Sequence, residues 1–170
     1  MHTKDFLNQI TRYYSDEGRE LIFEFFISIS RFECALKYTT EFVGGGEERV
    51  QPNWDKFVKS IAEKYEQNKN AEVNSAVDYI INYPPKLQVL RNGELRWRER
   101  PFPENTPEIK KLSQHIRDIR NNLFHGSKFH GRYVEETSRH YKLLKNAIII
   151  LNYWLSLSDE VRNNFLQNIR

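Results

Sequence analysis

The stretch from Leu21 to Phe32, LIFEFFISISRF, carries apolar side chains on nearly every face of a helix. A helix that is apolar all round is buried among other elements, so we expect this segment to form a central helix. Ser15-Asp16-Glu17 supplies an acidic first turn, which predicts a start at about Asp16. The run Gly44-Gly45-Gly46 predicts that the helix stops at about Val43.

Other segments also show helical spacing of their apolar residues. The pattern predicts helices over about 54–67, 71–82, 106–125, 135–156 and 158–169. Thr106 is a residue type that caps helices, and Pro107 suits the first helical position. Gly126 suits the end of that helix.

The segment from Leu87 to Arg98 differs in kind from the rest. It holds Asn92-Gly93 between two short runs with apolar residues, which is the strongest local signal for a β-hairpin. The sequence therefore predicts one domain over residues 1–170, all-α in class. We expect an up-and-down helical bundle with a small β-hairpin insertion at about 86–100.

The composition is that of a soluble globular domain, with 39% hydrophobic and 29% charged residues. The longest apolar run, Ala147 to Leu151, is too short to cross a bilayer, and no export signal is visible at the N-terminus. A single cysteine, Cys34, excludes an internal disulfide framework and a cysteine-based zinc site. We expect a cytoplasmic protein with no membrane association, no metal and no cofactor.

Positive charge is concentrated in one part of the chain. Residues 86–132 contain eleven Lys and Arg against five Asp and Glu, a surplus of six, whereas the whole chain has a net charge of +3. Charged side chains usually only solvate a surface. An uneven distribution of this kind nevertheless favours an acidic ligand lying on one face.

The helix predicted over 106–125 has two distinct faces. Its apolar stripe comprises Ile109, Leu112, Ile116, Ile119 and Leu123, at spacings of 3, 4, 3 and 4. Its polar stripe comprises Gln114, Arg117, Asp118, Asn121 and His125, with Arg120 at the border. Taken alone, this pattern predicts an ordinary amphipathic helix with a solvated outer face.

The string Arg120-Asn121-Asn122-Leu123-Phe124-His125 changes that interpretation. It resembles the signature of the HEPN family, an arginine separated by four to six residues from a histidine near a helix end. In that family a polar residue, often asparagine, commonly follows the arginine. The similarity extends over about 16–156, because an apolar early helix and a long apolar helix after the motif also resemble HEPN organisation.

The resemblance implies a metal-independent ribonuclease that leaves a cyclic phosphate and a free 5′ hydroxyl. These residue types suit that reaction. His125 can take a proton from the attacking 2′-hydroxyl or give one to the leaving oxygen, because its pKa lies near neutrality. Arg120 offers a planar set of donors to the phosphate oxygens. Asn121, one turn before His125, can orient the imidazole or hold the phosphate.

The reaction geometry also predicts an assembly. The attacking and leaving oxygens lie on opposite sides of phosphorus, so one histidine cannot easily serve both. A two-fold homodimer would bring two copies of His125 and Arg120 around one phosphate. This agrees with the composite, dimeric sites that the resemblance implies.

Several residues are expected to support this site. Glu33 either forms a simple i,i+4 ion pair with Lys37 or reaches Arg120 or His125, as an acidic residue on an early helix does in some HEPN proteins. The remaining supporting and RNA-binding candidates are Arg117, Asn122, Lys128, Arg96 and Arg98. The hairpin arginines either grip RNA beside Trp97 or solvate a hairpin whose Trp97 covers the core. We expect His115, His130 and His140 to be surface or capping residues.

Three functions remain open at this point. The first is an endoribonuclease acting on mRNA or tRNA as the toxin of a toxin–antitoxin or antiviral-defence system, with an antitoxin or other neutralising partner. The second is a non-catalytic HEPN module that binds RNA, a nucleotide or a partner protein. The third is a helical interaction domain. Fold alone cannot separate them, and the intact Arg-Asn-x3-His string favours the enzyme.

Overall fold

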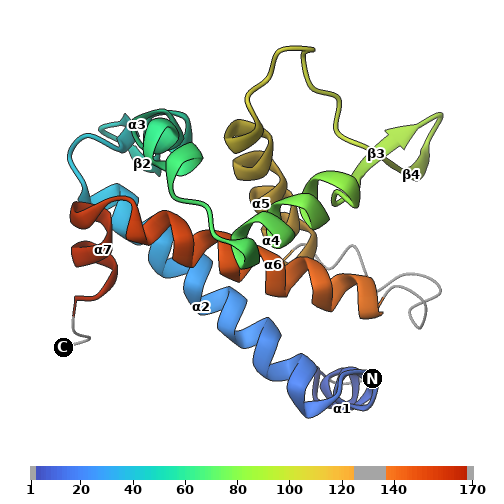
Figure 1. The fold of residues 1–170 in the computed structure, drawn as a ribbon. Helices are drawn as coiled ribbons and strands as arrows, with labels where there is room; N and C mark the ends of the chain where they lie inside the picture. The colour runs from blue at the N-terminus through green and yellow to red at the C-terminus, as the bar shows by residue number, and fades with distance from the viewer. Residues whose placement is uncertain (1–2, 125–136, 168–170) are drawn as a thin grey trace.

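Helices dominate the structure, a computed structural model that describes residues 3–124 and 137–167 (Figure 1). The helices within these ranges are α1 (Thr3–Tyr13), α2 (Asp16–Tyr38), α3 (Trp54–Gln67), α4 (Ala71–Asn82), α5 (Glu108–Phe124), α6 (Thr137–Ser156) and α7 (Asp159–Phe165). Two antiparallel hairpins accompany them, β1 (Val43–Gly46) with β2 (Arg49–Pro52), and β3 (Leu87–Arg91) with β4 (Glu94–Arg98). The mainly helical class is confirmed, but α1 and the hairpin β1–β2 were not predicted.

Helix α2 begins where the sequence predicts and ends five residues early. Ser15 caps its start by accepting a hydrogen bond from the Gly18 amide at 3.1 Å. Thr39 ends it, because its backbone is extended while its amide and hydroxyl both donate to the Ala35 carbonyl. The prediction that Gly44-Gly45-Gly46 stops the helix is wrong, since these residues form β1.

Gly45 shows why glycine is needed in that strand. Its φ is +88°, and an added Cβ would lie 2.0 Å from the carbonyl oxygen of Arg49 on the paired strand. No other residue tolerates both the backbone conformation and the close approach. The glycine run therefore serves the hairpin rather than the helix end.

The other helix boundaries match the predicted ones in part. Helices α3 and α4 match the predicted 54–67 and 71–82. Helix α5 starts after Pro107, whose carbonyl accepts its first bonds, while Thr106 donates to Pro103 instead of capping. Helix α7 ends at Phe165, before the predicted 169, and Arg31 donates to the carbonyl groups of Phe165 and Gln167 at 2.5 and 2.8 Å.

The core lies where α2 crosses α6 (Figure 1). Helix α7 packs against both of these helices, and α4 packs against α6. Phe25, Ile29 and Phe32 from α2 are at most 1% exposed, as is Trp154 from α6. The Trp54 ring stacks on Phe32 with centroids 5.2 Å apart, which joins α3 to this core. One face of α2 is therefore central to the fold, but the prediction of a helix buried on all sides is wrong, because Phe23, Phe26 and Ile27 are 66%, 41% and 41% exposed.

Helix α5 packs on α3, α4 and α6 through its predicted apolar stripe. Ile109, Leu112, Ile116 and Ile119 are buried, and Leu123 is partly buried against the core.

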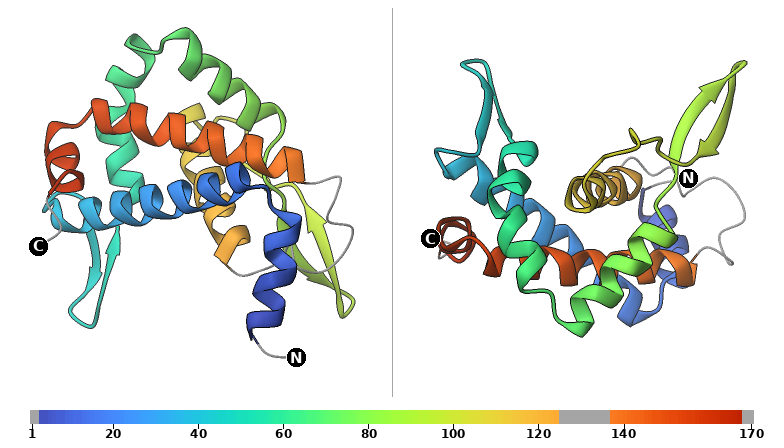
Figure 2. Two further views of the ribbon diagram at one scale, coloured as in Figure 1. Left: turned by 90° about the horizontal axis from the view of Figure 1, so that it is seen from below. Right: turned by 45° about the horizontal axis from the view of Figure 1, so that its top comes forward.

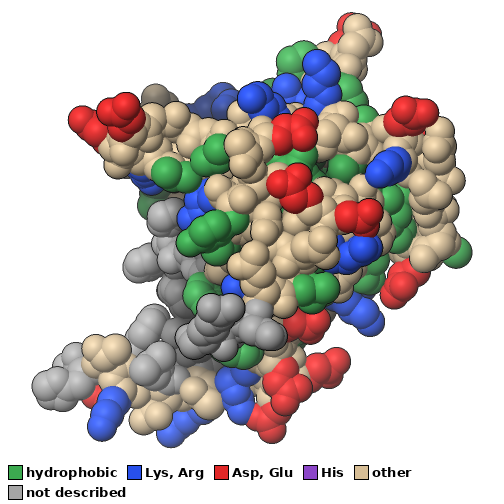
Figure 3. Space-filling view, turned by 90° about the vertical axis from the view of Figure 1, so that its left-hand side faces the viewer, with side chains coloured by type: hydrophobic (Ala, Val, Ile, Leu, Met, Phe, Trp, Pro, Cys, Tyr) green, Lys and Arg blue, Asp and Glu red, His purple; other side chains and the backbone are tan. Residues whose placement is uncertain are grey.

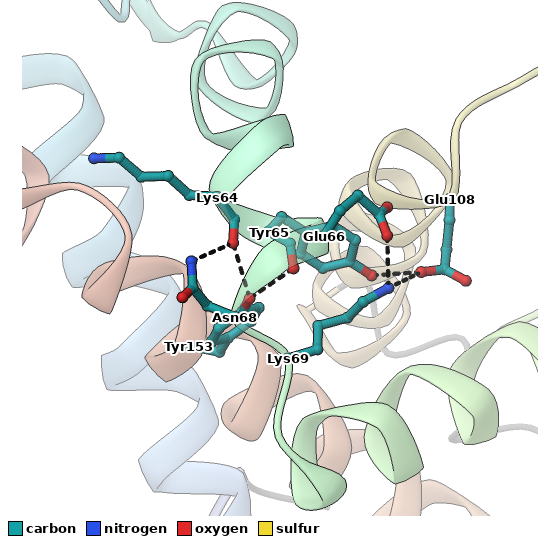
Figure 4. A network of polar contacts seen from close by, with 7 residues as sticks. All are labelled: Lys64, Tyr65, Glu66, Asn68, Lys69, Glu108 and Tyr153. Carbon is teal, nitrogen blue, oxygen red and sulfur yellow. Dashed lines mark hydrogen bonds and ion pairs between the residues drawn. The ribbon is translucent and has the colours of Figure 1, made fainter.

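Polar contacts fix the first turn of α5 (Figure 4). The Tyr65 hydroxyl donates to Glu108 at 2.7 Å and the Lys69 ammonium group to the same oxygen at 3.1 Å. Tyr65 lies in the last turn of α3 and Lys69 two residues after that helix, so the first turn of α5 is held against the end of α3.

The hairpin β3–β4 is the one predicted from Asn92-Gly93. Both residues have positive φ, 51° and 79°, as a tight two-residue hairpin turn requires. Figure 2 shows that the two hairpins project from the same side of the helices, with α5 between them. Among the described helices, none is long and apolar enough to span a membrane.

Candidate functional site

Arg120 lies near the end of α5 and forms an ion pair with Glu33 of α2. The distance from Arg120 Nη2 to Glu33 Oε1 is 2.8 Å. The Trp54 indole N–H at the start of α3 donates to the same oxygen at 3.4 Å. Of the two roles expected for Glu33, the structure shows contact with Arg120, and no Glu33–Lys37 ion pair occurs among the described side chains.

This ion pair is partly shielded from water. The Arg120 side chain is 30% exposed and that of Glu33 is 21% exposed. An arginine carries five N–H donors, and the Nε of Arg120 is buried without a hydrogen-bond partner within the described part of the chain. The ion pair therefore holds the guanidinium in one orientation through its Nη2 group.

The asparagines after Arg120 have different surroundings. Asn121 is half-buried. Asn122 is fastened to the segment before β3, since its side-chain amide donates to the Lys86 carbonyl at 2.9 Å. His125 and Lys128 lie outside the residues that the structure describes, so their predicted roles stay predictions.

The hairpin β3–β4 stands beside this end of α5. A pocket of about 110 Å³ is lined by Trp97 of β4, by Ile119 and Asn122 of α5, and by Arg139 of α6. Trp97 is 43% exposed and is not part of the core cluster. Of the two interpretations of the hairpin, an aromatic side chain open to a ligand fits this geometry better than a cover for the core.

The basic side chains of the hairpin face solvent. Arg96 and Arg98 are exposed, and Arg96 pairs with Glu94 at 2.5 Å. By contrast, acidic and basic side chains are interspersed over much of the face shown in Figure 3. The excess of positive charge in 86–132 is thus partly displayed on the hairpin next to α5.

The outer face of α5 is not uniformly solvated, contrary to the amphipathic prediction. Asp118 is only 1% exposed. Arg100 approaches it with two parallel hydrogen bonds, Nε to Oδ2 at 2.7 Å and Nη2 to Oδ1 at 2.6 Å. The segment after β4 folds over α5 and buries this ion pair.

Two histidines predicted at the surface are buried. His115 is 4% exposed and His140 is 3% exposed. The His115 ring packs against the Phe102 ring in a T-shaped contact with centroids 5.2 Å apart. His130 lies outside the described residues. For His115 the prediction failed because the loop that covers it, with Phe102, carries no sequence pattern that indicates which side chains it buries.

The burial of His115 predicts a loss of stability in mild acid. Burial lowers the pKa of His115 from 6.5 to about 4, although Asp118 opposes the shift. In the unfolded chain the His115 imidazole is protonated below about pH 6.5, whereas in the folded chain it stays neutral until the pH falls to about 4. Above pH 6.5 this effect costs no stability. As the pH falls from 6.5 to 4, the free energy of unfolding is expected to decrease by up to about 3 kcal/mol.

Urea denaturation at several pH values measures this dependence. A His115→Gln variant is expected to show a shallower fall in the free energy of unfolding between pH 6.5 and 4 than the parent protein. Identical slopes in both proteins would exclude His115 as the cause.

Among the described side chains, no group of three His, Cys, Asp or Glu is placed to hold a metal ion. Comparisons with protein-family models, with curated proteins and with solved structures found no match for this chain. The contact of Glu33 with Arg120 was one of the two possibilities that the sequence left open. The contact of Glu33 with Trp54 was not predicted, because the two residues are 21 positions apart and no local pattern indicates it.

Proposed function

We propose that this chain is a metal-independent endoribonuclease of the HEPN type, with a helical HEPN-like bundle as its scaffold. The observation that supports this most is the ion pair between Glu33 and Arg120. It is the contact that the resemblance implies between an acidic residue on an early helix and the motif arginine. The arginine is thereby oriented at the helix end that leads into His125.

The proposed reaction uses the 2′-hydroxyl of the RNA as nucleophile. His125 of one copy takes the proton from this hydroxyl as the oxygen attacks phosphorus. The bond from phosphorus to the 5′-oxygen breaks, and the second His125 of the dimer gives that oxygen a proton. Arg120 donates hydrogen bonds to the non-bridging oxygens as their negative charge grows. The products are a 2′,3′-cyclic phosphate and a free 5′-hydroxyl.

The composite site requires a homodimer. Two motif helices related by a two-fold axis would supply both histidines and both arginines to one phosphate. The cleavage rate per chain is then expected to fall on dilution below the dissociation constant of the dimer. A monomer that retains full activity would contradict this part of the proposal.

The RNA strand is expected to pass over the end of α5 and the hairpin beside it. Asn121 would orient His125 or hold the phosphate, with Arg117 and Asn122 in support. Arg96, Arg98 and Lys128 would contact the RNA backbone, while Trp97 would stack on a base. The biological setting that we propose is a toxin of a toxin–antitoxin or antiviral-defence system, controlled by a neutralising partner.

Expression in a bacterial host tests the proposal. The wild-type protein is expected to arrest growth and cause RNA decay, and a His125→Ala variant is expected to do neither. A Lys145→Ala variant, which changes an exposed side chain of α6, should behave as wild type. Equal growth arrest and equal RNA decay with His125→Ala would instead favour a non-catalytic HEPN module that acts by binding.

A further inference from the structure

A larger pocket lies along the same helix, beginning one turn before Arg120. Its volume is about 240 Å³. Its lining includes Gln114 and Arg117 of α5, Lys110 near the start of that helix, Asp55 of α3, and Arg100 and Phe102 of the covering loop. Ligand pockets for drug-sized molecules typically begin at about 300 Å³. This one therefore suits a small group or part of a nucleotide.

Arg117 is a partly buried cation that pairs with no anion among the described residues. It is half-buried, and burial lowers the pKa of its guanidinium, which Asp55 and Asp118 offset only in part. Its Nη2 donates to the Gln114 side chain, but its Nε is buried without a hydrogen-bond partner among the described residues. No carboxylate of the described chain lies within ion-pair distance of it. A partly buried cation without an anion is costly unless something else completes it.

The charges around the pocket favour an anion. Arg100 already gives two donors to Asp118, so it contributes little free charge. The lining contains one acidic side chain, Asp55, and two basic side chains that are not otherwise paired in the described part of the chain, Arg117 and the exposed Lys110. The lining therefore keeps a surplus of positive charge, and its two available cations, Lys110 and Arg117, lie about two turns apart on α5.

We propose that this pocket binds a phosphate group, and that on an RNA strand it is a phosphate next to the one that is cut. The second part rests on the proposed function. Residues three apart on a helix have Cβ atoms about 5–6 Å apart, so a strand held by Arg120 passes within reach of Arg117. Phe102, half-buried at the pocket wall, offers ring surface to the attached base.

Binding of a fluorescent 2′-O-methyl oligonucleotide tests the pocket without cleavage, because its 2′-oxygen cannot attack. The affinity of Arg117→Ala is expected to be about tenfold weaker than wild type. The slope of log K against log salt should shrink by about 0.7, the value for one lost phosphate contact on a single strand. Arg117→Lys should keep the slope, and Lys145→Ala, which loses the same charge elsewhere, should match wild type.

Two further measurements complete the test. Lys110→Ala changes an exposed side chain and should also reduce the slope, which keeps the test valid if Arg117→Ala does not fold. Competition with adenosine 5′-monophosphate separates the two sources of phosphate. If adenosine 5′-monophosphate displaces the oligonucleotide from wild type but not from Arg117→Ala, the pocket binds a single mononucleotide. If only the oligonucleotide binds in an Arg117-dependent way, the pocket requires an RNA strand. Unchanged affinity and slope in folded Arg117→Ala and in Lys110→Ala would overturn the proposal.

Failure of the pocket and failure of the proposed function give different results. If wild type does not cut RNA but its binding depends on Arg117, the ribonuclease proposal fails and the phosphate site stands. If His125→Ala abolishes cleavage while Arg117→Ala and Lys110→Ala bind and cut as wild type does, the phosphate site fails and the ribonuclease stands.

Discussion

Replacing Arg120 with alanine is expected to lower the rate constant of RNA cleavage by about 10²–10³-fold, the usual cost of removing one donor that stabilises transition-state charge. The loss should appear in kcat more than in KM, because the guanidinium binds most strongly when negative charge has built up on the phosphate. Single-turnover cleavage of a labelled RNA measures it. Full activity in Arg120→Ala would contradict the role given to this residue.

Variants of Glu33 test whether Arg120 depends on its ion pair. It is a positioning residue, so Glu33→Gln, which keeps a hydrogen bond to Arg120 but removes the charge, is expected to cost only about tenfold. Because Glu33 acts through Arg120, the double variant should be no slower than Arg120→Ala alone. Additive losses would show that Glu33 acts on the reaction by another route.

Replacing Asp118 with alanine is expected to lower the free energy of unfolding by about 3–5 kcal/mol, the usual cost of removing one partner of a buried ion pair. Arg100 would then remain 26% exposed with no carboxylate to accept its two hydrogen bonds. The loop that covers His115 would lose its main attachment to α5. Urea denaturation monitored by circular dichroism measures the change.

Asp159→Ala is the control for this prediction. Asp159 also pairs with an arginine, Arg162, at 2.7 Å, but its side chain is 82% exposed. Pairs of this kind contribute about 0–1 kcal/mol. Equal losses in Asp118→Ala and Asp159→Ala would contradict the importance that we give to burial.

Much of the fold follows from local signals in the sequence. The 3–4 spacing from Ile109 to Ile119 marks a single buried stripe, and the structure buries that stripe. Asn92-Gly93 specifies its turn through two positive φ angles. Helices α3 and α4 begin directly after Asn53 and Asn70, whose side-chain oxygens each accept a hydrogen bond from the backbone amide three residues further on. Each of these features depends on residues close together in the chain.

The remaining features depend on partners that lie far apart in the sequence. Nothing around Asp118 indicates that Arg100, 18 residues earlier, would fold over it. Gly44-Gly45-Gly46 fits a helix stop as well as a strand until its pairing with β2 is known. For Glu33, the spacing allowed an ion pair with Lys37 and the resemblance suggested Arg120 or His125. The packing of distant helices selects Arg120.

The most direct test is cleavage of a defined RNA by the purified protein in the presence of EDTA, with the product ends analysed. The proposal predicts fragments with 2′,3′-cyclic phosphate and 5′-hydroxyl ends from wild type, and intact RNA with His125→Ala. Products with 5′-phosphate ends, or the same cleavage by His125→Ala, would contradict it.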